Sequence, residues 1–428
     1  MYKIIIQKSE NLRGAVEVGG SKNAVLPLMA ATLLTEEPCI ISGVPNLKDV
    51  DVMCRLLGSF GAVVDVDQAA AQIRVDASNI VSSVAPPELV KAMRASIVSM
   101  GPLLARTGKA GIPLPGGCAI GDRPIDLHIK GFIALGADVE MVGDENDDGF
   151  VTACAARMRG AEMYLDFASV GATENIMMAA ALAEGTTIIE NPAQEPEIVD
   201  LANFLNKMGA RIRGAGTDVI RIEGVSRLHG AEHSVIPDRI EAGTFMLAAA
   251  ITRSSVLVGN MLPNHVMPIT AKLRECGVLI KEEGTGLRVD ATRGVLRATD
   301  IKTLPYPGFP TDIQPQFMAF LTTVPGPSNV IETVFENRFM HIEELNRMNA
   351  GIIEAGRRAI LKGGAALRGA DVRATDLRAG AALVLAGLAA EGTTEVTDVF
   401  HIDRGYDNLV GKLAELGARI KRVRRSES

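Results

Sequence analysis

A cysteine lies in the middle of a loop built from glycine and proline, in the segment IPLPGGCAIGDRPIDLH of residues 112–128. Pro115 and Pro124 bracket this loop, Cys118 lies near its centre, and Arg123 follows shortly after. Because glycine permits unusual backbone angles and proline stiffens the chain, Cys118 is not in the context of a core residue. A free thiol has a pKa of about 8.5, so it can donate a proton at neutral pH, or act as a nucleophile once nearby cations ionise it. The loop predicts one of these roles; a cysteine without a role on a solvent lid remains the alternative.

Basic side chains gather on loops and at the starts of predicted helices: Lys22, Arg94, Arg123, Arg338, Arg378 and Arg404. The whole chain has a formal charge of −7, and a local cationic cluster in such a protein concentrates an anionic ligand. Lys22 is followed by Asn23, and a cation beside an amide suits a phosphate or a sugar oxygen. Arg94 opposes the dipole of the helix that it opens, which indicates a function rather than a structural role. Taken singly, each cation is more often part of a surface ion pair, and Lys22–Asn23 is equally well explained by an ordinary first helical turn.

Carboxylates lie in comparable places, in the motifs FPTD, ATDLRAG and HIDRGY. Asp312 fits a helix N-cap, because an aspartate there accepts hydrogen bonds from free backbone N–H groups. Taken alone, Asp312 is therefore expected to be a helix cap. Only the basic residues in the comparable positions of other copies favour a role in a binding or catalytic site. Asp376 and Asp403 lie beside Arg378 and Arg404 and carry the same two interpretations.

These residues recur at one position of an internal repeat of about 70 residues, long enough for each copy to be a supersecondary unit. Each copy has a polar or charged opener, a helix of small residues, a strand, a second helix and a turn. The openers read SKNAVLP from Ser21, MRASIVS from Met93, SVGATEN from Ser169, DRIEAGT from Asp238, PTDIQPQ from Pro310 and DLRAGAA from Asp376. Helix N-termini carry unpaired N–H groups and partial positive charge, so converging openers would form a pocket for a strongly anionic substrate.

The turns that close the second helices are equally regular. They read FGA at Phe60, LGA at Leu135, MGA at Met208, CGV at Cys276, MNA at Met348 and LGA at Leu416. The central residue is predicted to adopt the left-handed conformation that ends a helix. Asn349 replaces glycine in the fifth copy, and asparagine is the next most tolerant residue of that conformation.

A β-branched strand follows the first helix in five copies, within residues 38–44, 186–192, 254–260, 328–334 and 393–399. In the second copy a glycine-rich loop takes its place. A short strand after each turn completes a βαβ-type unit, in which parallel pairing would be right-handed. The pattern predicts an α/β fold with two domains of three copies each.

The first domain is predicted to span residues 22–236 and to carry the cysteine loop of residues 115–124. The second is predicted to comprise residues 1–21 plus 237–428. It includes the strand of residues 2–7, because chain termini often lie close together. Two crossings, near residues 18–21 and 235–237, would allow a hinge.

Composition excludes several classes of protein. The acidic balance argues against a nucleic-acid partner, and the run KRVRR from Lys421 is predicted to be a solvated strand end. No apolar run reaches the roughly 18 residues of a spanning helix, so no membrane partner and a cytoplasmic location are expected. Five widely spaced cysteines without a CxxC pair predict neither a metal site nor disulfides, and Cys39, Cys54, Cys154 and Cys276 are expected to be buried. The sequence indicates no oligomeric state.

Eight motifs follow one another in a familiar order: SKNA from Ser21, MRAS from Met93, PGGCAIGDRP from Pro115, SVGAT from Ser169, FPTD from Phe309, ENRFMH from Glu336, ATDLRA from Ala374 and HIDRGY from His401. They resemble the UDP-N-acetylglucosamine 1-carboxyvinyltransferases, a family of enolpyruvyl transferases, over essentially the whole chain. The loop centred on cysteine separates this family from its sister, the 3-phosphoshikimate 1-carboxyvinyltransferases. One position departs from the pattern, since Phe167 stands where some members carry a lysine near the uridine diphosphate.

The resemblance implies two inverse α/β-barrel-like domains, each of three βαβαββ units, with the active site in the cleft between them. It implies transfer of the enolpyruvyl group of phosphoenolpyruvate to the 3′-hydroxyl of UDP-N-acetylglucosamine, with release of phosphate, as the first committed step of peptidoglycan precursor synthesis. No cofactor and no metal are implied. Closure of the two domains would bring acid and base together only with substrate bound.

The resemblance also assigns roles to residues. Cys118 would donate a proton to the methylene carbon and be the target of fosfomycin, and Asp312 would be the base toward the sugar hydroxyl. Lys22 and Arg404 complete the implied catalytic set, and they bind phosphoenolpyruvate together with Asn23 and Arg123. The implied contacts to the nucleotide sugar are Arg94, Arg123, Pro124, Ile125, Asp126, Leu127, Asp312 and Val334, with Ser169, Val170 and Gly171 near the diphosphate and Arg338, Asp376 and Arg378 as further cleft residues.

Other functions remain as alternatives. A 3-phosphoshikimate-type transferase would use the same fold on another acceptor. A non-catalytic relative would bind a nucleotide sugar without turnover, although the intact Cys118, Lys22, Asp312 and Arg404 speak against it. A fold relative acting on RNA ends is disfavoured by the acidic charge and by the lack of a histidine-centred site.

Overall fold

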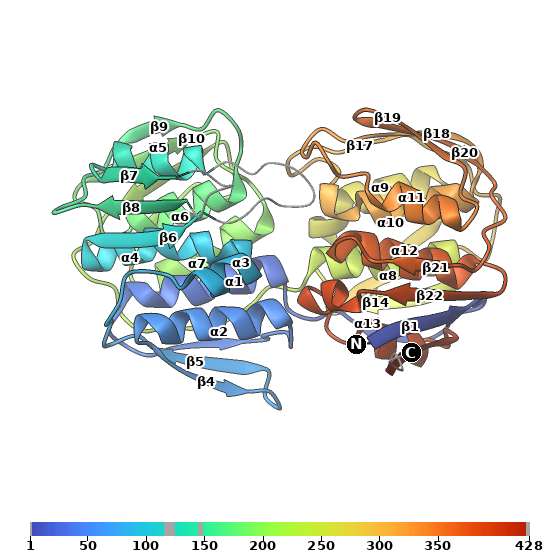
Figure 1. The fold of residues 1–428 in the computed structure, drawn as a ribbon, viewed down its shortest axis with the longest axis horizontal. Helices are drawn as coiled ribbons and strands as arrows, with labels where there is room; N and C mark the ends of the chain where they lie inside the picture. The colour runs from blue at the N-terminus through green and yellow to red at the C-terminus, as the bar shows by residue number, and fades with distance from the viewer. Residues whose placement is uncertain (1, 115–124, 144–148, 425–428) are drawn as a thin grey trace. The chain divides into compact units, whose positions relative to one another are not determined.

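The computed structural model describes residues 2–114, 125–143 and 149–424 (Figure 1). Cys118, Arg123 and Pro124 lie outside these ranges. The chain divides into two compact units. The N-terminal unit begins at Gly20 and ends at Ile236, and the C-terminal unit contains the described residues up to Gly19 and those from Pro237 onward. The chain therefore passes between the units at Gly19–Gly20 and at Ile236–Pro237.

One copy of the repeat in the N-terminal unit illustrates the architecture. It consists of β9 (Glu162–Tyr164), α6 (Val170–Ala180), β10 (Thr186–Glu190), α7 (Pro196–Lys207), β11 (Arg211–Arg213) and β12 (Val219–Glu223). The strands form a sheet in the order β11-β12-β10-β9. Strand β10 pairs in parallel with β9 and antiparallel with β12, so that Ile188 lies opposite both Glu162 and Arg221. The unit is thus βαβαββ with one parallel pair, as predicted.

The first copy of the N-terminal unit follows the same plan, whereas the sheet of the second has three strands, with an isolated parallel bridge between Val84 and Gly111 in place of the first strand. The first contains β13 (Glu232–Ser234), α1 (Lys22–Ala31), η1 (Thr32–Leu34), β3 (Cys39–Ser42), α2 (Lys48–Phe60), β4 (Val63–Asp67) and β5 (Gln72–Asp76). The second contains α3 (Pro87–Ala92), η2 (Arg94–Ser99), α4 (Met100–Thr107), β6 (Lys109–Pro113), α5 (Asp126–Ala134), β7 (Asp138–Val142) and β8 (Phe150–Cys154). Strand β13 comes from the end of the unit and pairs in parallel with β3, which closes the ring of copies.

The C-terminal unit repeats the plan three times. Its first copy contains β2 (Ala15–Glu17), α8 (Arg239–Ile251), β14 (Ser255–Gly259), η3 (Pro263–Val266), α9 (Met267–Glu275), β15 (Leu279–Glu283) and β16 (Gly286–Asp290). The second contains β17 (Ile301–Lys302), η4 (Thr311–Ile313), α10 (Gln314–Thr323), β18 (Pro325–Ile331), α11 (His341–Arg347), β19 (Ile352–Ala355) and β20 (Arg358–Gly363). The third contains β21 (Asp371–Arg373), α12 (Leu377–Ala389), β22 (Thr393–Thr397), η5 (Val399–Arg404), α13 (Leu409–Glu415), β23 (Ile420–Arg424) and β1 (Tyr2–Gln7), which pairs with β22 and β23.

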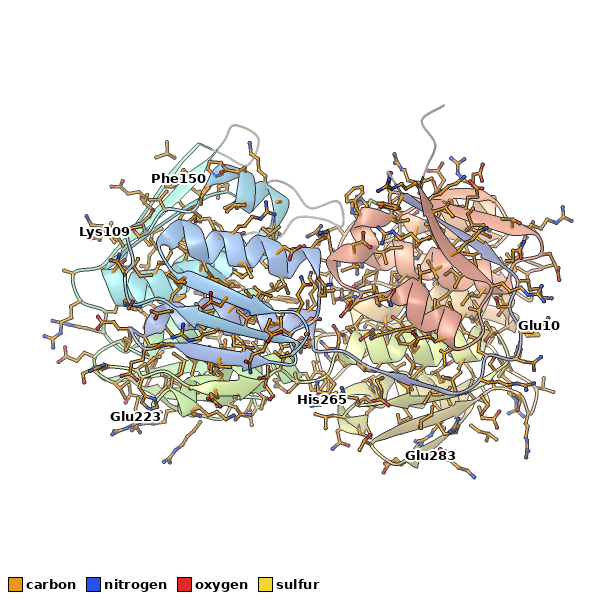
Figure 2. The ribbon with its side chains drawn as sticks, turned by 90° about the horizontal axis from the view of Figure 1, so that it is seen from below. Glu10, Lys109, Phe150, Glu223, His265 and Glu283 are labelled. Carbon is orange, nitrogen blue, oxygen red and sulfur yellow. The ribbon has the colours of Figure 1, made fainter. Side chains whose placement is uncertain are left out.

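The first helix of each copy is apolar around almost its whole circumference, which is typical of a helix inside a core. In the C-terminal unit, α8, α10 and α12 contact one another, and nearly all of their residues are buried. The sheets lie outside these helices and alternate buried and exposed residues. In β12, Ile220 and Ile222 are buried, whereas Glu223 is exposed and points outward, as Glu283 does at the end of β15 (Figure 2).

The closing turns confirm the prediction from their sequence. The glycines of five copies have positive φ, from +90° at Gly136 to +107° at Gly61. Asn349 adopts φ +69° in the fifth copy. This position is therefore set by backbone conformation, because a side chain costs free energy in that region of φ.

The prediction for the strand of the second copy is wrong. A strand, β6, occupies Lys109–Pro113 and pairs antiparallel with β8, immediately before the glycine-rich loop. Its residues KAGIP lack the β-branched pattern of the other copies. Glycine is favoured at position 111, because a Cβ atom would lie 3.0 Å from the Phe150 ring on β8 and 3.3 Å from Val84. The ring thus fills the space that a side chain would occupy.

The cysteine prediction holds for Cys39 and Cys276, which are buried, whereas Cys54 is half-buried. Burial raises the pKa of Cys39 and Cys54 to about 11 and that of Cys276 to about 12, so these thiols stay protonated. The expected burial of Cys154 is wrong, because it ends β8 on an exposed position. The basic residues of β23 are a strand end with exposed side chains, as predicted. Among the described residues, none of the helices combines the length and the apolar character needed to cross a bilayer.

Candidate functional site

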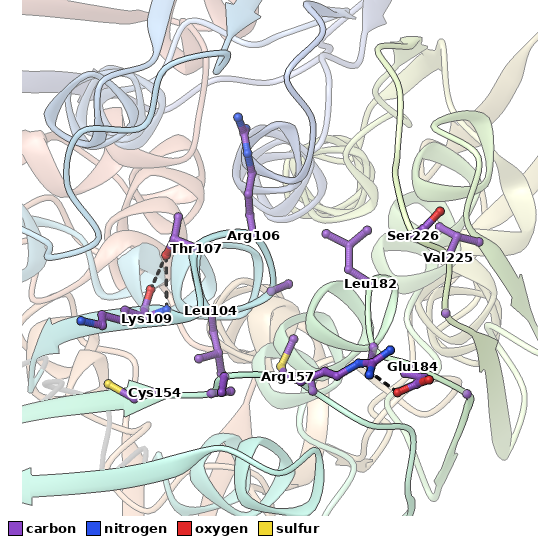
Figure 3. Close-up of a pocket in the computed structure, with 18 of the residues that line it drawn as sticks. Leu104, Arg106, Thr107, Lys109, Cys154, Arg157, Leu182, Glu184, Val225 and Ser226 are labelled. Carbon is purple, nitrogen blue, oxygen red and sulfur yellow. Dashed lines mark hydrogen bonds and ion pairs between the residues drawn. The ribbon is translucent and has the colours of Figure 1, made fainter.

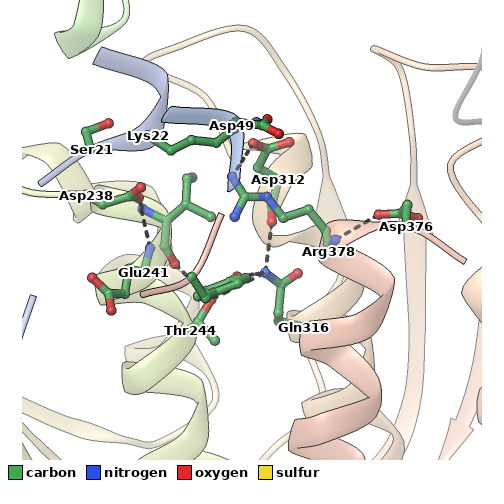
Figure 4. Close-up of polar contacts among 12 residues, drawn as sticks. Ser21, Lys22, Asp49, Asp238, Glu241, Thr244, Asp312, Gln316, Asp376 and Arg378 are labelled. Carbon is green, nitrogen blue, oxygen red and sulfur yellow. Dashed lines mark hydrogen bonds and ion pairs between the residues drawn. The ribbon is translucent and has the colours of Figure 1, made fainter. Parts of the chain in front are cut away.

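The C-terminal unit holds a cluster of two carboxylates, Asp312 and Asp376, and two guanidinium groups, Arg338 and Arg378. Figure 4 shows Asp312, Asp376 and Arg378. Arg338 donates from Nη2 to Asp312 Oδ1 at 3.1 Å, and Arg378 donates from Nη2 to Asp312 Oδ2 at 2.9 Å. Arg338 Nη1 also lies 3.8 Å from Asp376 Oδ1. The side chains of both arginines are 3 % exposed, whereas that of Asp312 is 26 % exposed. The carboxylate is therefore the part of this cluster that a ligand can reach.

The openers of two copies bring these residues together. Asp312 lies in η4, the single turn that leads into α10. Asp376 is the N-cap of α12 and accepts from the backbone N–H groups of Arg378 and Ala379 at 2.8 and 3.1 Å. Arg378 is thereby fixed in the first turn of α12, and its side chain reaches the opener of the neighbouring copy.

The expectation that Asp312 is a helix cap is wrong. The N-cap of η4 is Pro310, which has no capping side chain, and the Asp312 carboxylate accepts from the two arginines instead. Glu332, a buried residue that follows β18, holds the η4 turn in place, because its carboxylate accepts from the Thr311 hydroxyl at 3.0 Å. Glu332 also accepts from the backbone N–H of Val334 at 2.8 Å, and so places that predicted residue.

The surroundings of Arg378 keep its guanidinium charged. Burial alone would lower the pKa of Arg378, but the Asp312 carboxylate and Tyr406 outweigh it, so that the pKa lies above its usual value. The Nε and Nη1 atoms of Arg378 and Nε of Arg338 are buried and have no hydrogen-bond partner among the described residues. His341 packs nearby, and burial lowers its pKa below the ordinary value, so it is neutral at pH 7. The cluster therefore contains more positive donor groups than its own carboxylates satisfy.

Arg404 is the last residue of η5, in the copy that also provides Asp376 and Arg378. The N-cap of η5, Asp398, has a left-handed backbone with φ +53°. Asp403, beside it, forms an ion pair with Arg422 at 2.6 Å. The surface ion-pair interpretation is therefore correct for Asp403.

In the N-terminal unit, Lys22 and Asn23 are the first residues of α1, after Ser21, whose side chain caps the helix. Lys22 Nζ lies 3.0 Å from Oδ2 of Asp49, a buried residue in the first turn of α2. Asp49 was not predicted from the sequence. It could have been noticed there, because it is a carboxylate on the otherwise apolar face of α2, where a buried charge requires a partner.

Arg94 opens η2, and it lies near a buried histidine of the same unit. Burial first, and then the charge of Arg94, lower the pKa of His128 to about 4. Asn175 Nδ2 contacts both His128 Nδ1 and the carbonyl of Ile97 at 2.8 Å, and its Oδ1 accepts from the N–H of Gly101 at 2.8 Å. Because the amide nitrogen is a donor, His128 Nδ1 must be an acceptor, which makes Nε2 the protonated nitrogen. This hub connects α5, α6 and the η2–α4 segment.

The remaining predicted residues occupy two helix starts of the same unit. Ser169 is the N-cap of α6, and Val170 and Gly171 form its first turn. Ile125 precedes α5, and Asp126 and Leu127 begin it. Phe167, just before α6, is exposed. Cys118, Arg123 and Pro124 lie outside the described residues.

Two helix starts of the C-terminal unit, those of α8 and α12, do not provide the anion sites that the repeat predicted. Asp238 caps α8 by accepting from Ile240 and Glu241, and Asp376 caps α12. Carboxylates already satisfy these N–H groups, so an anionic ligand would have to be bound by side chains there. The arginines around Asp312 are side chains of the required charge.

A cavity of about 870 Å³ in the N-terminal unit involves other residues (Figure 3). Its lining includes Arg106, Lys109, Cys154, Arg157 and Glu184, and none of the described residues predicted for the site. Arg106 donates to the carbonyls of Leu33 and Thr35, and Arg157 pairs with Glu184 at 3.0 Å. Those charges are occupied by protein groups, so the cavity does not compete with the cluster as the candidate site.

Comparison with known sequences connects this geometry to a family. The profile described as EPSP synthase (3-phosphoshikimate 1-carboxyvinyltransferase) matches residues 6–413. UDP-N-acetylglucosamine 1-carboxyvinyltransferase 1 of Caldanaerobacter subterraneus subsp. tengcongensis is 58 % identical over 420 residues, which cover 98 % of this chain and 99 % of that protein. UDP-N-acetylglucosamine 1-carboxyvinyltransferase of Finegoldia magna is 56 % identical over 430 residues, covering 99 % of each.

Solved structures agree on the fold. The enolpyruvyl transferase NikO from Streptomyces tendae superposes with a TM-score of 0.87 at 26 % identity, over 99 % of both chains. An EPSP synthase from Acinetobacter baumannii superposes with a TM-score of 0.73 at 16 % identity, over 99 % of this chain and 100 % of that one. The predicted α/β fold of repeated βαβαββ units is therefore confirmed.

Proposed function

Because the chain belongs to the UDP-N-acetylglucosamine 1-carboxyvinyltransferase family of enolpyruvyl transferases, we propose that it transfers the enolpyruvyl group of phosphoenolpyruvate to the 3′-hydroxyl of UDP-N-acetylglucosamine, with release of phosphate. One observation carries this proposal: relatives of that name are 56–58 % identical over nearly their full length. This enzyme would supply the first committed precursor of peptidoglycan. We place it in the cytoplasm for that reason, with a role in cell shape and division.

The reaction is an addition followed by an elimination. The sugar oxygen bonds to the central carbon of phosphoenolpyruvate while its proton leaves to a base, and a proton is added to the methylene carbon. The tetrahedral intermediate then loses phosphate from the central carbon and a proton from the new methyl group, which restores the double bond. The protein must therefore supply a base, an acid and cations for the phosphate and carboxylate groups.

The C-terminal unit would supply the base. Asp312 is partly exposed, and each of its carboxylate oxygens accepts one N–H from an arginine, which fixes its orientation. A carboxylate in such a position can accept the proton of a substrate hydroxyl. Arg338 and Arg378 would hold this carboxylate ionised and oriented. Arg404 would bind phosphoenolpyruvate, while Val334 and Asp376 would border the nucleotide sugar.

The N-terminal unit would supply the acid and most of the anion contacts. Cys118 would donate the proton to the methylene carbon, and Lys22, Asn23 and Arg123 would bind phosphoenolpyruvate. The nucleotide sugar would contact Arg94, residues 124–127 and the start of α6 at residues 169–171. In this proposal Asp49 keeps Lys22 extended toward its ligand, since the two lie 3.0 Å apart.

The test measures phosphate release from phosphoenolpyruvate with purified protein and one acceptor at a time. We expect turnover with UDP-N-acetylglucosamine and none with shikimate 3-phosphate. Turnover with shikimate 3-phosphate alone would make the chain a transferase of the sister type. Binding of the nucleotide sugar without phosphate release would make it a non-catalytic binding protein. A parallel arm adds fosfomycin, which should abolish turnover through Cys118 and should leave a Cys118→Asp variant unmodified by mass.

A further inference from the structure

Three buried polar side chains form a second cluster beneath Asp312 in the C-terminal unit (Figure 4). Thr244 belongs to α8, Gln316 to α10, and Tyr406 follows η5. The Thr244 and Tyr406 hydroxyls lie 2.8 Å apart, and Gln316 Nε2 lies 3.1 Å from the Tyr406 hydroxyl. All three side chains are buried in an otherwise apolar core, where polar groups cost free energy unless they are paired. Nothing in the proposed reaction uses them directly.

The hydrogen bonds of this cluster run in one direction. The Thr244 hydroxyl donates to the carbonyl of Ile240 at 2.8 Å, so it can only accept from Tyr406. The Tyr406 hydroxyl therefore donates to Thr244 and accepts from Gln316. The second N–H of Gln316 donates to the main-chain carbonyl of Asp312 at 3.0 Å. Gln316 Nε2 also lies 3.3 Å from the Thr244 hydroxyl oxygen, so the N–H that points away from Asp312 is shared between the Tyr406 and Thr244 oxygens.

The main chain and the carboxylate of Asp312 are both connected to this cluster. Its main-chain carbonyl accepts from Gln316. Its carboxylate accepts from Arg378, whose guanidinium lies over the Tyr406 ring at 5.5 Å from the centroid. A carboxylate whose backbone and counter-ion are both fixed has little freedom to rotate, and a small misplacement of a catalytic group costs rate.

We infer that Tyr406, Thr244 and Gln316 are positioning residues that set the place and orientation of Asp312 for the attack of the sugar hydroxyl. This inference rests on the proposed function, because it needs Asp312 to be the base. The cluster connects the first helices of two copies, α8 and α10, with the chain after η5, and it supports Arg378 at the start of α12. The relative placement of three openers is thereby locked around one carboxylate.

The test compares matched variants in the phosphate-release assay. Thr244→Val removes the hydroxyl at nearly constant volume, and Thr244→Ser restores it. Tyr406→Phe removes the other hydroxyl but keeps the ring under Arg378. Thr322→Val is the control, because Thr322 is also buried in α10 but its hydroxyl bonds only to Ala319 within its own helix. We expect kcat to fall roughly 10-fold in Thr244→Val and Tyr406→Phe, with KM nearly unchanged, and to stay near the wild-type value in Thr244→Ser and Thr322→Val.

A double-mutant cycle separates positioning from a general loss of structure. If the cluster acts through Asp312, Tyr406→Phe should change kcat by less than about 2-fold in an Asp312→Asn background. Full kcat in Thr244→Val and Tyr406→Phe, an effect on KM alone, or an undiminished effect in the Asp312→Asn background would overturn the inference. If circular dichroism shows that Thr244→Val does not fold, Tyr406→Phe and its double-mutant cycle with Asp312→Asn decide whether the inference holds. Failure of the proposed function would appear in the wild type, whereas failure of this inference appears only in the variants.

Discussion

The carboxylate of Asp312 combines two properties that a general base needs. Its two oxygens each accept one N–H from a buried arginine, so its orientation is fixed. Its side chain is partly exposed, so a substrate hydroxyl can approach it. The carboxylate of an N-cap aspartate instead accepts hydrogen bonds from the backbone N–H groups of its own helix, as those of Asp238 and Asp376 do.

His128 predicts a pH dependence of stability. Its pKa is about 4 in the folded protein, below the ordinary 6.5, because it is buried and lies near the charge of Arg94. Below pH 6.5 the unfolded chain binds a proton that the folded chain refuses, so this residue lowers stability progressively from about pH 6.5 to about pH 4. The free energy of unfolding, measured with urea between pH 7.5 and pH 4.5, should therefore fall less steeply in His128→Gln, which keeps an acceptor for Asn175. Parallel curves for the two proteins would show that His128 does not titrate in this way.

The residues of the candidate site could be predicted where they belong to a motif that is continuous in the sequence. The cysteine loop, the cationic openers and Asp312 are visible in the sequence. Asp49, Glu332 and Tyr406 were missed, because each acts on a residue far away in the chain and has no local pattern of its own. Gln316 in α10 and Thr244 in α8 carried a signal, since polar side chains within apolar helices are usually hydrogen-bonded inside the core.

The turn that ends each second helix is the most regular element of the repeat. Its glycine has a positive φ in every copy except the fifth, where asparagine takes its place. The sequence predicted this element because the requirement is local. Strand β6 was missed for the opposite reason, since its glycine is explained only by the Phe150 ring on the neighbouring strand.

Two alanine substitutions separate backbone strain from crowding at this turn. Gly136 and Gly61 have φ +90° and +107°; an added Cβ would lie 3.9 Å from the nearest neighbour at Gly136 but 2.5 Å from the Asn79 carbonyl oxygen at Gly61. Gly136→Ala should therefore cost about 1–2 kcal/mol of unfolding free energy from strain alone, and Gly61→Ala clearly more. Urea denaturation of both variants measures the difference. Equal losses would mean that the Asn79 carbonyl moves away without cost.

The whole molecule is built from six variations of one unit, arranged as two compact units of three. The internal repeat made this organisation predictable, and the crossings predicted near residues 18–21 and 235–237 compare with unit boundaries at Gly19–Gly20 and Ile236–Pro237. The polar content of the first helices differs between the units. Acids cap α8 and α12 in the C-terminal unit, whereas serines cap α1 and α6 in the N-terminal unit. The proposed base, Asp312, and one proposed phosphoenolpyruvate contact, Arg404, lie in the C-terminal unit, whereas Lys22 and Asn23 lie in the N-terminal unit.

Proton transfer to and from the methylene carbon is the central claim of the proposed reaction. The most direct measurement is the reaction of phosphoenolpyruvate with UDP-N-acetylglucosamine in deuterium oxide, followed by proton and phosphorus NMR. The account predicts one enol ether of the nucleotide sugar per phosphate released, with deuterium in its vinyl group, because the intermediate methyl group carries a solvent-derived deuteron when it loses a proton. Phosphate release without an enol ether, or an enol ether whose vinyl group contains only protium, would contradict it.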